Sequence, residues 1–316
     1  ATGSVWAADG FDDVFTETDT QDGQAATSVE ISGSIGVALD YFVDEGWDSA
    51  VGASPESTLK LETGSDTLTG SAVFSLGASN ADILDEIYLR AFLPFGYFDA
   101  GLLKVEWGRG DGTHVIDPLN PLDQTNGIST DILDLKKAEI MTVMSFYLGE
   151  SGLFELVYKP FFHSILFATE GRWALGAPEV APPDTETLEY SQGAARISGS
   201  LGAFDLGALY YYGFMSEPGY EITTAFTGTN PMDPTHYTVM MDMVYTRAQL
   251  FGIDGVVAVG PLTIWTELGY WLSEDKDGVR PELYNDRFVY LGGIDIMVPG
   301  TSIFLSVQVT GAYVVY

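Results

Sequence analysis

The chain contains no cysteine among its 316 residues and only three histidines. The first absence excludes disulfide bonds, thiolate zinc sites, iron–sulfur clusters and cysteine nucleophiles. His114, His163 and His236 are far apart in sequence and fall in segments expected to be loops, without the spacing of a Ser/His or Asp/His hydrolase. Glycine loops of the GxGxxG and GxxxxGK[ST] types, which bind nucleotides, are also missing. We therefore expect no enzymatic activity, no cofactor and no metal site.

Basic residues are scarce as well: 13 Lys and Arg stand against 45 Asp and Glu, which gives a net charge of −32. They are scattered singly, which argues against nucleic acid as a partner, because phosphate binding needs clustered Lys and Arg. No run of 18 apolar residues occurs, so a transmembrane helix is not expected. The chain is nevertheless 46% hydrophobic and 13% aromatic, and this composition excludes general disorder.

What the chain has throughout is alternation of apolar and polar side chains. Between residues 29 and 43 every second position is apolar or glycine, namely Ile31, Gly33, Ile35, Val37, Leu39, Tyr41 and Val43. A period of two over this length predicts an extended strand, since a helix would place these side chains all round its circumference.

The same pattern recurs in thirteen spans, which are 29–43, 57–63, 67–77, 83–93, 97–107, 137–148, 153–161, 187–202, 204–214, 237–258, 261–272, 287–298 and 302–315. Thirteen is odd, whereas bacterial single-chain barrels have an even number of strands. We therefore expect about 14 strands (12 to 14), with the last one beyond Tyr316 or a closing one within residues 1–27.

Short and long connections alternate along the chain. Tight turns are expected at 64–66, 94–96, 149–152, 202–203, 260–261 and 299–301, and long loops at 44–56, 108–136, 162–186, 215–236 and 273–286. This regularity places tight turns at one rim and long loops at the other, which a Greek-key sandwich would not produce. The sequence predicts an all-β, up-and-down antiparallel transmembrane β-barrel over residues 28–316, with long extracellular loops.

Aromatic residues support a membrane setting, because Tyr and Trp favour the interface between lipid and water. Those expected on the apolar face near strand ends are Tyr41, Tyr97, Trp107, Tyr210, Tyr212, Tyr270, Tyr290 and Tyr313. The chain begins at Ala1 rather than at Met, as expected after removal of an export signal. Residues 1–27 carry six acids and no bases; they form either a disordered leader or a plug held by aromatic residues.

The polar face of these strands holds interleaved charges that would line a lumen. The acids are Asp40, Glu62, Glu86, Glu106, Glu139, Glu155, Glu267 and Asp295, and the bases are Lys60, Arg90, Lys104, Lys137, Lys159 and Arg196. They either form cross-strand ion pairs that stabilise the wall of a water-filled lumen or produce a transverse electric field that selects solutes. In the long span 237–258, a bulge near Gly252 or Gly255 would let Arg247, Gln249 and Asp254 all face the lumen.

The longest connection, residues 108–136, also carries aliphatic side chains, namely Val115, Ile116, Leu119, Leu122, Ile132 and Leu133. A solvated loop gains nothing from exposing them, so we expect this loop to fold inward and narrow the pore. The candidate constriction residues are Asp111, His114, Asp117, Asn120 and Asp123. A calcium site among its acids is disfavoured, because the spacing of an EF-hand is absent.

Residues 104–123, KVEWGRGDGTHVIDPLNPLD, resemble a family of Gram-negative outer-membrane proteins, known from spirochaetes and proteobacteria, with the pattern W-G-x-x-D-G-x-x-V-x-D-x-x-N-P-x-D. The matching residues are Trp107, Gly108, Asp111, Gly112, Val115, Asp117, Asn120, Pro121 and Asp123. Residues 246–271 and the GFDDVF stretch of the leader are similar too, so that the likeness touches about a quarter of the chain. The resemblance implies an outer-membrane β-barrel whose members often run longer and whose transport role is poorly defined.

We therefore expect an outer-membrane channel for passive diffusion of small solutes, modestly cation-preferring because of its acidic balance. One alternative is a plugged carrier of hydrophobic small molecules; another is a structural or adhesive surface barrel. The expected partners are outer-membrane lipid, small solutes and the barrel-assembly machinery, and an oligomer is compatible with the sequence.

Overall fold

The computed structural model describes residues 9–10, 28–43, 49–77, 83–125, 127, 132–174, 180–228, 232 and 236–315. Apart from Asp9 and Gly10, the leader predicted as disordered or as a plug lies outside the described residues. The chain divides into two compact units, the first comprising Ala1–Lys104 with Ala138–Thr142 and the second Val105–Lys137 with Val143–Tyr316.

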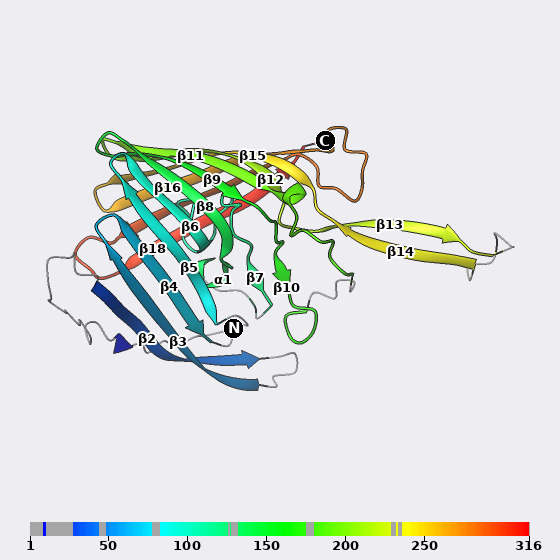
Figure 1. Ribbon diagram of the computed structural model, residues 1–316, viewed down its shortest axis with the longest axis horizontal. Coiled ribbons are helices and arrows are strands. Elements are labelled where there is room, and N and C mark those ends of the chain that lie inside the picture. The colour runs from blue at the N-terminus through cyan, green and yellow to red at the C-terminus, as the bar shows by residue number, and fades with distance from the viewer. Residues whose placement is uncertain are drawn as a thin grey trace. The chain divides into compact units, whose positions relative to one another are not determined.

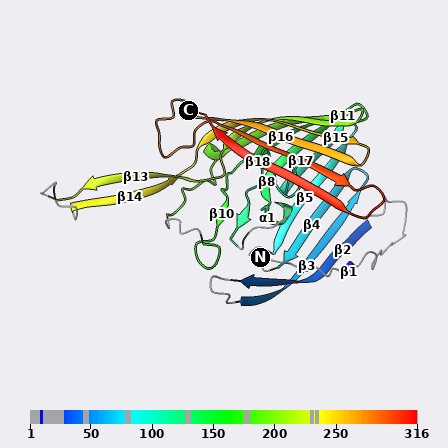
Figure 2. The same cartoon turned by 180° about the vertical axis from the view of Figure 1, so that it is seen from behind.

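The structure is all-β, and its main sheet is an antiparallel meander that follows the order of the chain (Figure 1). In the first unit the strands are β1 (Asp9–Gly10), β2 (Ser28–Val43), β3 (Ser49–Ser65), β4 (Leu68–Leu76), β5 (Leu84–Leu93), β6 (Gly96–Leu103) and the start of β8 (Glu139–Leu148). The order then continues through β9 (Gly152–Lys159), β11 (Gln192–Leu201), β12 (Phe204–Phe214), β15 (Arg247–Val259), β16 (Leu262–Ser273), β17 (Arg287–Met297) and β18 (Phe304–Val314). Figure 2 shows the same strands from behind. The predicted up-and-down antiparallel fold is confirmed.

The connections carry short elements, which are β7 (Asp123–Gln124), helix α1 (Ile132–Leu135), β10 (Leu166–Phe167), the 3-10 helix η1 (Leu188–Tyr190), β13 (Gly219–Phe226) and β14 (Tyr237–Val244). Among the described residues, no helix has both the length and the apolar character needed to span a membrane.

Fourteen strands form the main sheet of the described residues, and thirteen of them are eight residues or longer, which matches the thirteen spans of the sequence. Two boundaries were predicted wrongly. The expected loop 44–56 is largely strand, because β3 begins at Ser49 and pairs with β2 through to Val43. Pro55 pairs with Val37 of β2, but β4 pairs with β3 only from Ser57 onward, so that Pro55 lies in the part of β3 that has no partner on β4.

The span 237–258 was predicted as one strand but forms two. The break falls at Tyr245 and Thr246, which are both buried. Before the break, β14 pairs with β13 in a separate two-stranded hairpin; after it, β15 pairs with β12 and β16. The expected loop 215–236 is therefore partly strand, and the hairpin extends away from the β12–β15 pair that it interrupts (Figures 1 and 2).

The two faces of the sheet in the second unit differ in exposure. The arrangement is the reverse of that in a water-soluble protein, because apolar side chains are exposed and charged side chains are buried. On β15, Phe251 and Ile253 are 47% and 54% exposed, whereas Asp254, the next residue, is 4% exposed. The exposed apolar rows of this unit include Leu156, Tyr158, Ile197, Leu206, Tyr210, Tyr212, Ile264, Phe288, Tyr290 and Ile294. We call this surface the apolar face and the opposite one, which carries Asp254, the polar face.

The first unit shows the same arrangement. Its exposed apolar side chains on β2–β5 include Ile31, Ile35, Val37, Leu39, Leu59, Leu68, Leu76, Ile87 and Leu89. The alternate positions of β5 and β6 hold the half-exposed Arg90 and the buried Asp99. In both units, therefore, the strands expose apolar rows on one face and carry charged side chains on the other.

Candidate functional site

The connection between β6 and β8 packs on the polar face of the second unit. Its side chains Trp107, Ile116 and Leu119 are almost completely buried. Ile116 lies over Gly252 and Gly269, which are cross-strand partners on β15 and β16. Because a Cβ at Gly269 would approach Ile116 Cγ2 to 2.9 Å, the two glycines provide the space that the loop side chain occupies.

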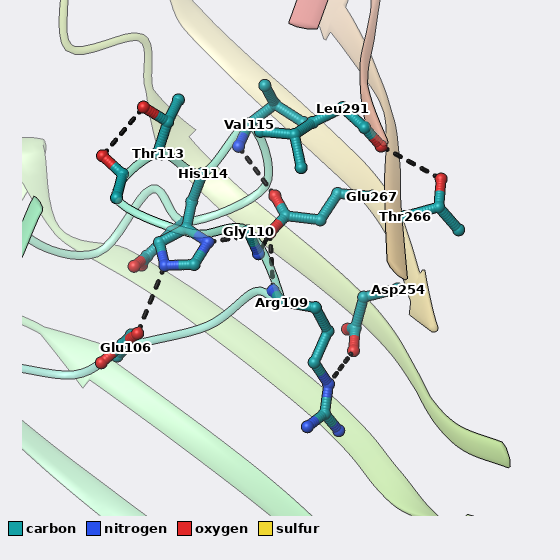
Figure 3. Close-up of polar contacts among 12 residues, drawn as sticks. Glu106, Arg109, Gly110, Thr113, His114, Val115, Asp254, Thr266, Glu267 and Leu291 are labelled. Carbon is teal, nitrogen blue, oxygen red and sulfur yellow. Dashed lines mark hydrogen bonds and ion pairs between the residues drawn. The ribbon is translucent and has the colours of Figure 1, made fainter. Parts of the chain in front are cut away.

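Glu267 of β16 is the central anchor of this loop (Figure 3). Its carboxylate is fully buried and accepts hydrogen bonds from the backbone N–H groups of Arg109 (2.6 Å), Gly110 (2.8 Å) and Val115 (2.8 Å). A buried carboxylate is stable only when its oxygens are satisfied by donors in this way. Glu267 was predicted as a lumen charge, and the structure places it beneath the loop.

Gly108 is required by the tight approach of the loop to this anchor. Its backbone has φ +135°, a conformation that residues other than glycine rarely adopt. A Cβ there would lie 2.3 Å from His114 Nδ1 and 2.6 Å from Glu267 Oε1. The glycine thus allows the backbone to reach the carboxylate.

His114 lies between two carboxylates. Its Nδ1 is 2.8 Å from Glu267 Oε1, and its Nε2 is 3.3 Å from Glu106 Oε1. The ring is 2% exposed, while the side chain of Glu106 is 45% exposed. Burial acts to lower the pKa of His114, but the hydrogen bond and the charge of Glu267 outweigh it and raise the pKa above its ordinary value of 6.5.

Asp254 of β15 forms the second anchor. It accepts a hydrogen bond from Arg109 Nε of the loop at 2.9 Å and from Arg196 Nη2 of β11 at 3.0 and 3.1 Å. Strand β12 lies between β11 and β15, and its Gly207 leaves the path open, since a Cβ there would lie 2.3 Å from Asp254 Oδ2. Arg196 therefore forms a buried ion pair with Asp254, and the same carboxylate binds Arg109 of the loop.

The rest of the loop is closed by its own polar residues. Asn120 accepts a hydrogen bond from Val105 N at 2.8 Å and donates one to Lys137 O at 2.8 Å. The ammonium of Lys136 donates to Val105 O at 2.8 Å and pairs with Asp117. From the strands, Lys159 of β9 donates to Leu119 O. Asp117, Asn120 and Lys159 thus hold the loop in place.

The two remaining loop candidates differ in their surroundings. Asp123 accepts a hydrogen bond from Thr125 N at 3.0 Å and stands in β7, which pairs in parallel with β10. Asp111 is exposed. No group of three or more His, Asp or Glu side chains suited to hold a metal occurs in the described part of the chain.

In the first unit the predicted charges are joined in local pairs. Arg90 binds Asp99 at 2.7 Å and lies over the ring of Tyr97. The backbone N–H of Lys104 donates to Glu86 at 2.7 Å, and its ammonium pairs with Asp85 at 2.6 Å. The predicted Lys60 and Glu62 also form an ion pair, at 2.9 Å.

Several expectations for individual residues were wrong. Lys104 and Glu106 were predicted within a strand over 97–107, but strand β6 ends at Leu103 and both residues lie beyond it. Trp107, expected on the apolar face, is buried beneath the loop.

The bulge expected near Gly252 or Gly255 is absent, because β15 pairs with β12 and β16 in unbroken register. Arg247 therefore shares the face of Phe251 and not that of Asp254. It donates from Nη2 to Glu189 O at 2.6 Å and lies over the ring of Phe214.

Of three more predicted charges, Glu139 belongs to the first unit, and Glu155 and Asp295 belong to the polar face of the second unit. Glu139 is buried, Glu155 is half-buried opposite Arg196, and Asp295 accepts a hydrogen bond from Trp265 Nε1 at 3.0 Å. The side chain of Asp40 lies outside the described residues. Sequence reasoning missed Asp99, Arg109 and Lys136; alternation within 97–107 could have placed Asp99 beside Arg90.

Comparison with known proteins finds similar solved structures but no relative in sequence. No family model matches the chain, and no curated protein matches it. The outer-membrane protein OmpT of Vibrio cholerae, folded in vitro and solved as a trimer, is similar with a TM-score of 0.47 and 13% identity over 90% of this chain and 78% of that one. A porin structure is similar with a TM-score of 0.34 and 11% identity over 90% of this chain and 94% of that one.

Proposed function

We propose that the chain is an outer-membrane β-barrel that lets small polar solutes diffuse across the membrane. The observation that carries this proposal is the exposure of the apolar rows in both units, with Arg196, Asp254 and Glu267 buried on the opposite face of the second unit. Large contiguous apolar surfaces are rarely exposed to water by soluble proteins, whereas a membrane barrel directs them to the hydrocarbon. The strands also have the length that a crossing needs, about 9–11 residues.

The loop on the polar face of the second unit is the part of the molecule suited to select solutes. Of its described charges, the carboxylates of Glu106, Asp111 and Asp134 are exposed. The bases around it are engaged, since Lys136 pairs with Asp117 and Arg109 with Asp254. A passing ion would therefore meet uncompensated negative charge, which favours cations modestly.

Planar-bilayer recording tests the proposal. The full chain, refolded in detergent and added to a bilayer, should give steady ohmic conductance with a modest cation preference. The refolded protein should also migrate differently on a gel before and after boiling, which reports folding independently. A heat-modifiable protein that leaves the bilayer silent contradicts the channel.

One observation favours a second candidate, a carrier of hydrophobic molecules. On the apolar side of β2, β3 and β4 lies an open groove of about 600 Å³. Its lining includes Ile31, Gly33, Ile35, Leu59, Phe74, Leu76 and Ile83. Such a surface would suit an apolar solute that leaves into lipid. A silent bilayer, together with uptake of a hydrophobic dye that is lost in Leu59→Asp, would support the carrier over the channel.

A further inference from the structure

The contacts of His114 set a limit on how many carboxylates its ring can satisfy. Both ring nitrogens face carboxylate oxygens, Nδ1 toward Glu267 and Nε2 toward Glu106 (Figure 3). A protonated imidazole has two N–H donors and satisfies both oxygens, but a neutral imidazole has only one. Loss of the ring proton therefore leaves one carboxylate facing a nitrogen lone pair.

The structure decides which carboxylate loses its donor. Glu267 is fully buried and also accepts three backbone N–H groups, so it stays in place and keeps the shorter contact with the ring. Glu106 is 45% exposed and contacts the ring at the longer distance of 3.3 Å. Water can replace the ring around Glu106, so this is the contact that breaks.

We propose that His114 acts as a proton-operated switch for Glu106, and that Glu106 is the residue that sets the cation preference of the channel. The inference rests on the proposed function. With the ring charged, the negative charge of Glu106 is compensated by its neighbour. With the ring neutral, Glu106 presents a full negative charge to passing ions, and the cation preference rises.

The other charged groups around the ring do not take part in this exchange. They are Arg109, Asp117, Lys136 and, through Arg109, Asp254. Arg109 is paired with Asp254, and Lys136 with Asp117, within the second unit. Glu267 is held by the loop backbone. Within this group of charges, the pair that combines a titrating ring with a carboxylate open to solvent is His114 with Glu106.

The switch is tested by reversal potentials of the reconstituted full chain in a KCl gradient at pH 5 and pH 8. In the wild type, the permeability ratio of potassium to chloride should rise about two- to fourfold from pH 5 to pH 8, the effect of one unit charge near a water-filled path. Glu106→Gln should give a low ratio at both pH values. His114→Gln should remove the pH dependence, because no ring proton remains to be lost.

Two matched variants serve as controls. His163→Gln removes a histidine whose Nε2 lies 3.6 Å from the exposed Glu186, and Glu150→Gln removes an exposed acid in the β8–β9 turn. Both should keep the wild-type pH dependence. A conducting wild type with the same ratio at pH 5 and pH 8, or a Glu106→Gln variant that retains the change, overturns the inference and leaves the channel intact.

A silent wild type would instead overturn the proposed function. The contact can then be examined alone, by following the His114 ring through an NMR titration in detergent. Glu106→Gln should lower the pH at which the ring loses its proton, because the variant removes a negative neighbour. An unchanged titration contradicts the contact on which the switch depends.

Discussion

Ile116 of the loop lies directly over Gly269 of β16, so close that a Cβ at the glycine would come within 2.9 Å of Ile116 Cγ2. The space left by this glycine, together with that at Gly252, is what lets the loop lie against the sheet. The position of the loop therefore depends on the absence of two side chains as much as on the presence of polar anchors.

Gly269→Ala should displace Ile116 and loosen the loop. Overpacking of this kind costs about 1–3 kcal/mol in the free energy of unfolding, which urea titration in lipid vesicles would measure. Gly193→Ala is the matched control, because its Cβ would meet only Val157 O, at 3.9 Å. Equal stability of the two variants would show that Ile116 does not depend on this space.

Glu267→Gln should release the loop by a different route. The amide offers only one acceptor oxygen, so the N–H of Val115, which is bound to the second carboxylate oxygen, would face an NH₂ group. Leaving a buried donor unsatisfied costs about 1–3 kcal/mol in the free energy of unfolding. Protease cleavage within residues 108–136 should become faster in this variant. Cleavage at the wild-type rate would contradict the anchoring role of Glu267.

Arg196 and Asp254 should behave as one unit. Breaking a buried pair by removing one partner costs about 3–5 kcal/mol, because a charge is left uncompensated. Arg196→Met and Asp254→Asn should therefore each destabilise strongly, while the double variant should cost less than their sum. A double-mutant cycle in urea measures this coupling. Additive effects would indicate that the two side chains act independently.

The stability conferred by His114 should fall as pH rises. The pKa of its ring is raised in the folded chain above 6.5, so its contribution to the free energy of unfolding is fully present below the unfolded pKa and is lost as pH rises through the folded pKa. The stability difference between wild type and His114→Gln, followed from pH 5 to pH 9, should shrink accordingly. A difference that grows with pH would contradict the raised pKa.

The sheet could be predicted from sequence because its signal is local: alternation repeats along the strands, and the thirteen spans correspond to the thirteen long strands of the main sheet. Strand ends were harder to place. The break at Tyr245 depends on burial among residues such as Phe162, which are distant in sequence. Pro55 within β3 likewise resembles a loop residue until it is known to lie outside the β3–β4 ladder.

The sequence predicts which kinds of residue form the candidate site, but not which of them contact one another. Inward charges such as Glu267 and Arg196 follow from their parity along a strand, and loop packing is favoured by aliphatic residues such as Ile116. The odd or even position of a residue along its strand cannot show which charged side chains form ion pairs. The pairing of Arg109 with Asp254, 145 residues apart, requires the loop to lie on one particular pair of strands.

The most direct test of the account is which face of the sheet meets lipid. The chain has no cysteine, so a single Cys can be placed and spin-labelled at Ile253 on the apolar face of β15, or at Ser198 on the polar face of β11, in the refolded protein in vesicles. The account predicts that membrane-soluble oxygen relaxes the label at position 253 and that a water-soluble nickel chelate relaxes the label at position 198. A label at position 253 that responds to the nickel chelate and not to oxygen would contradict the claim that the apolar rows face the membrane.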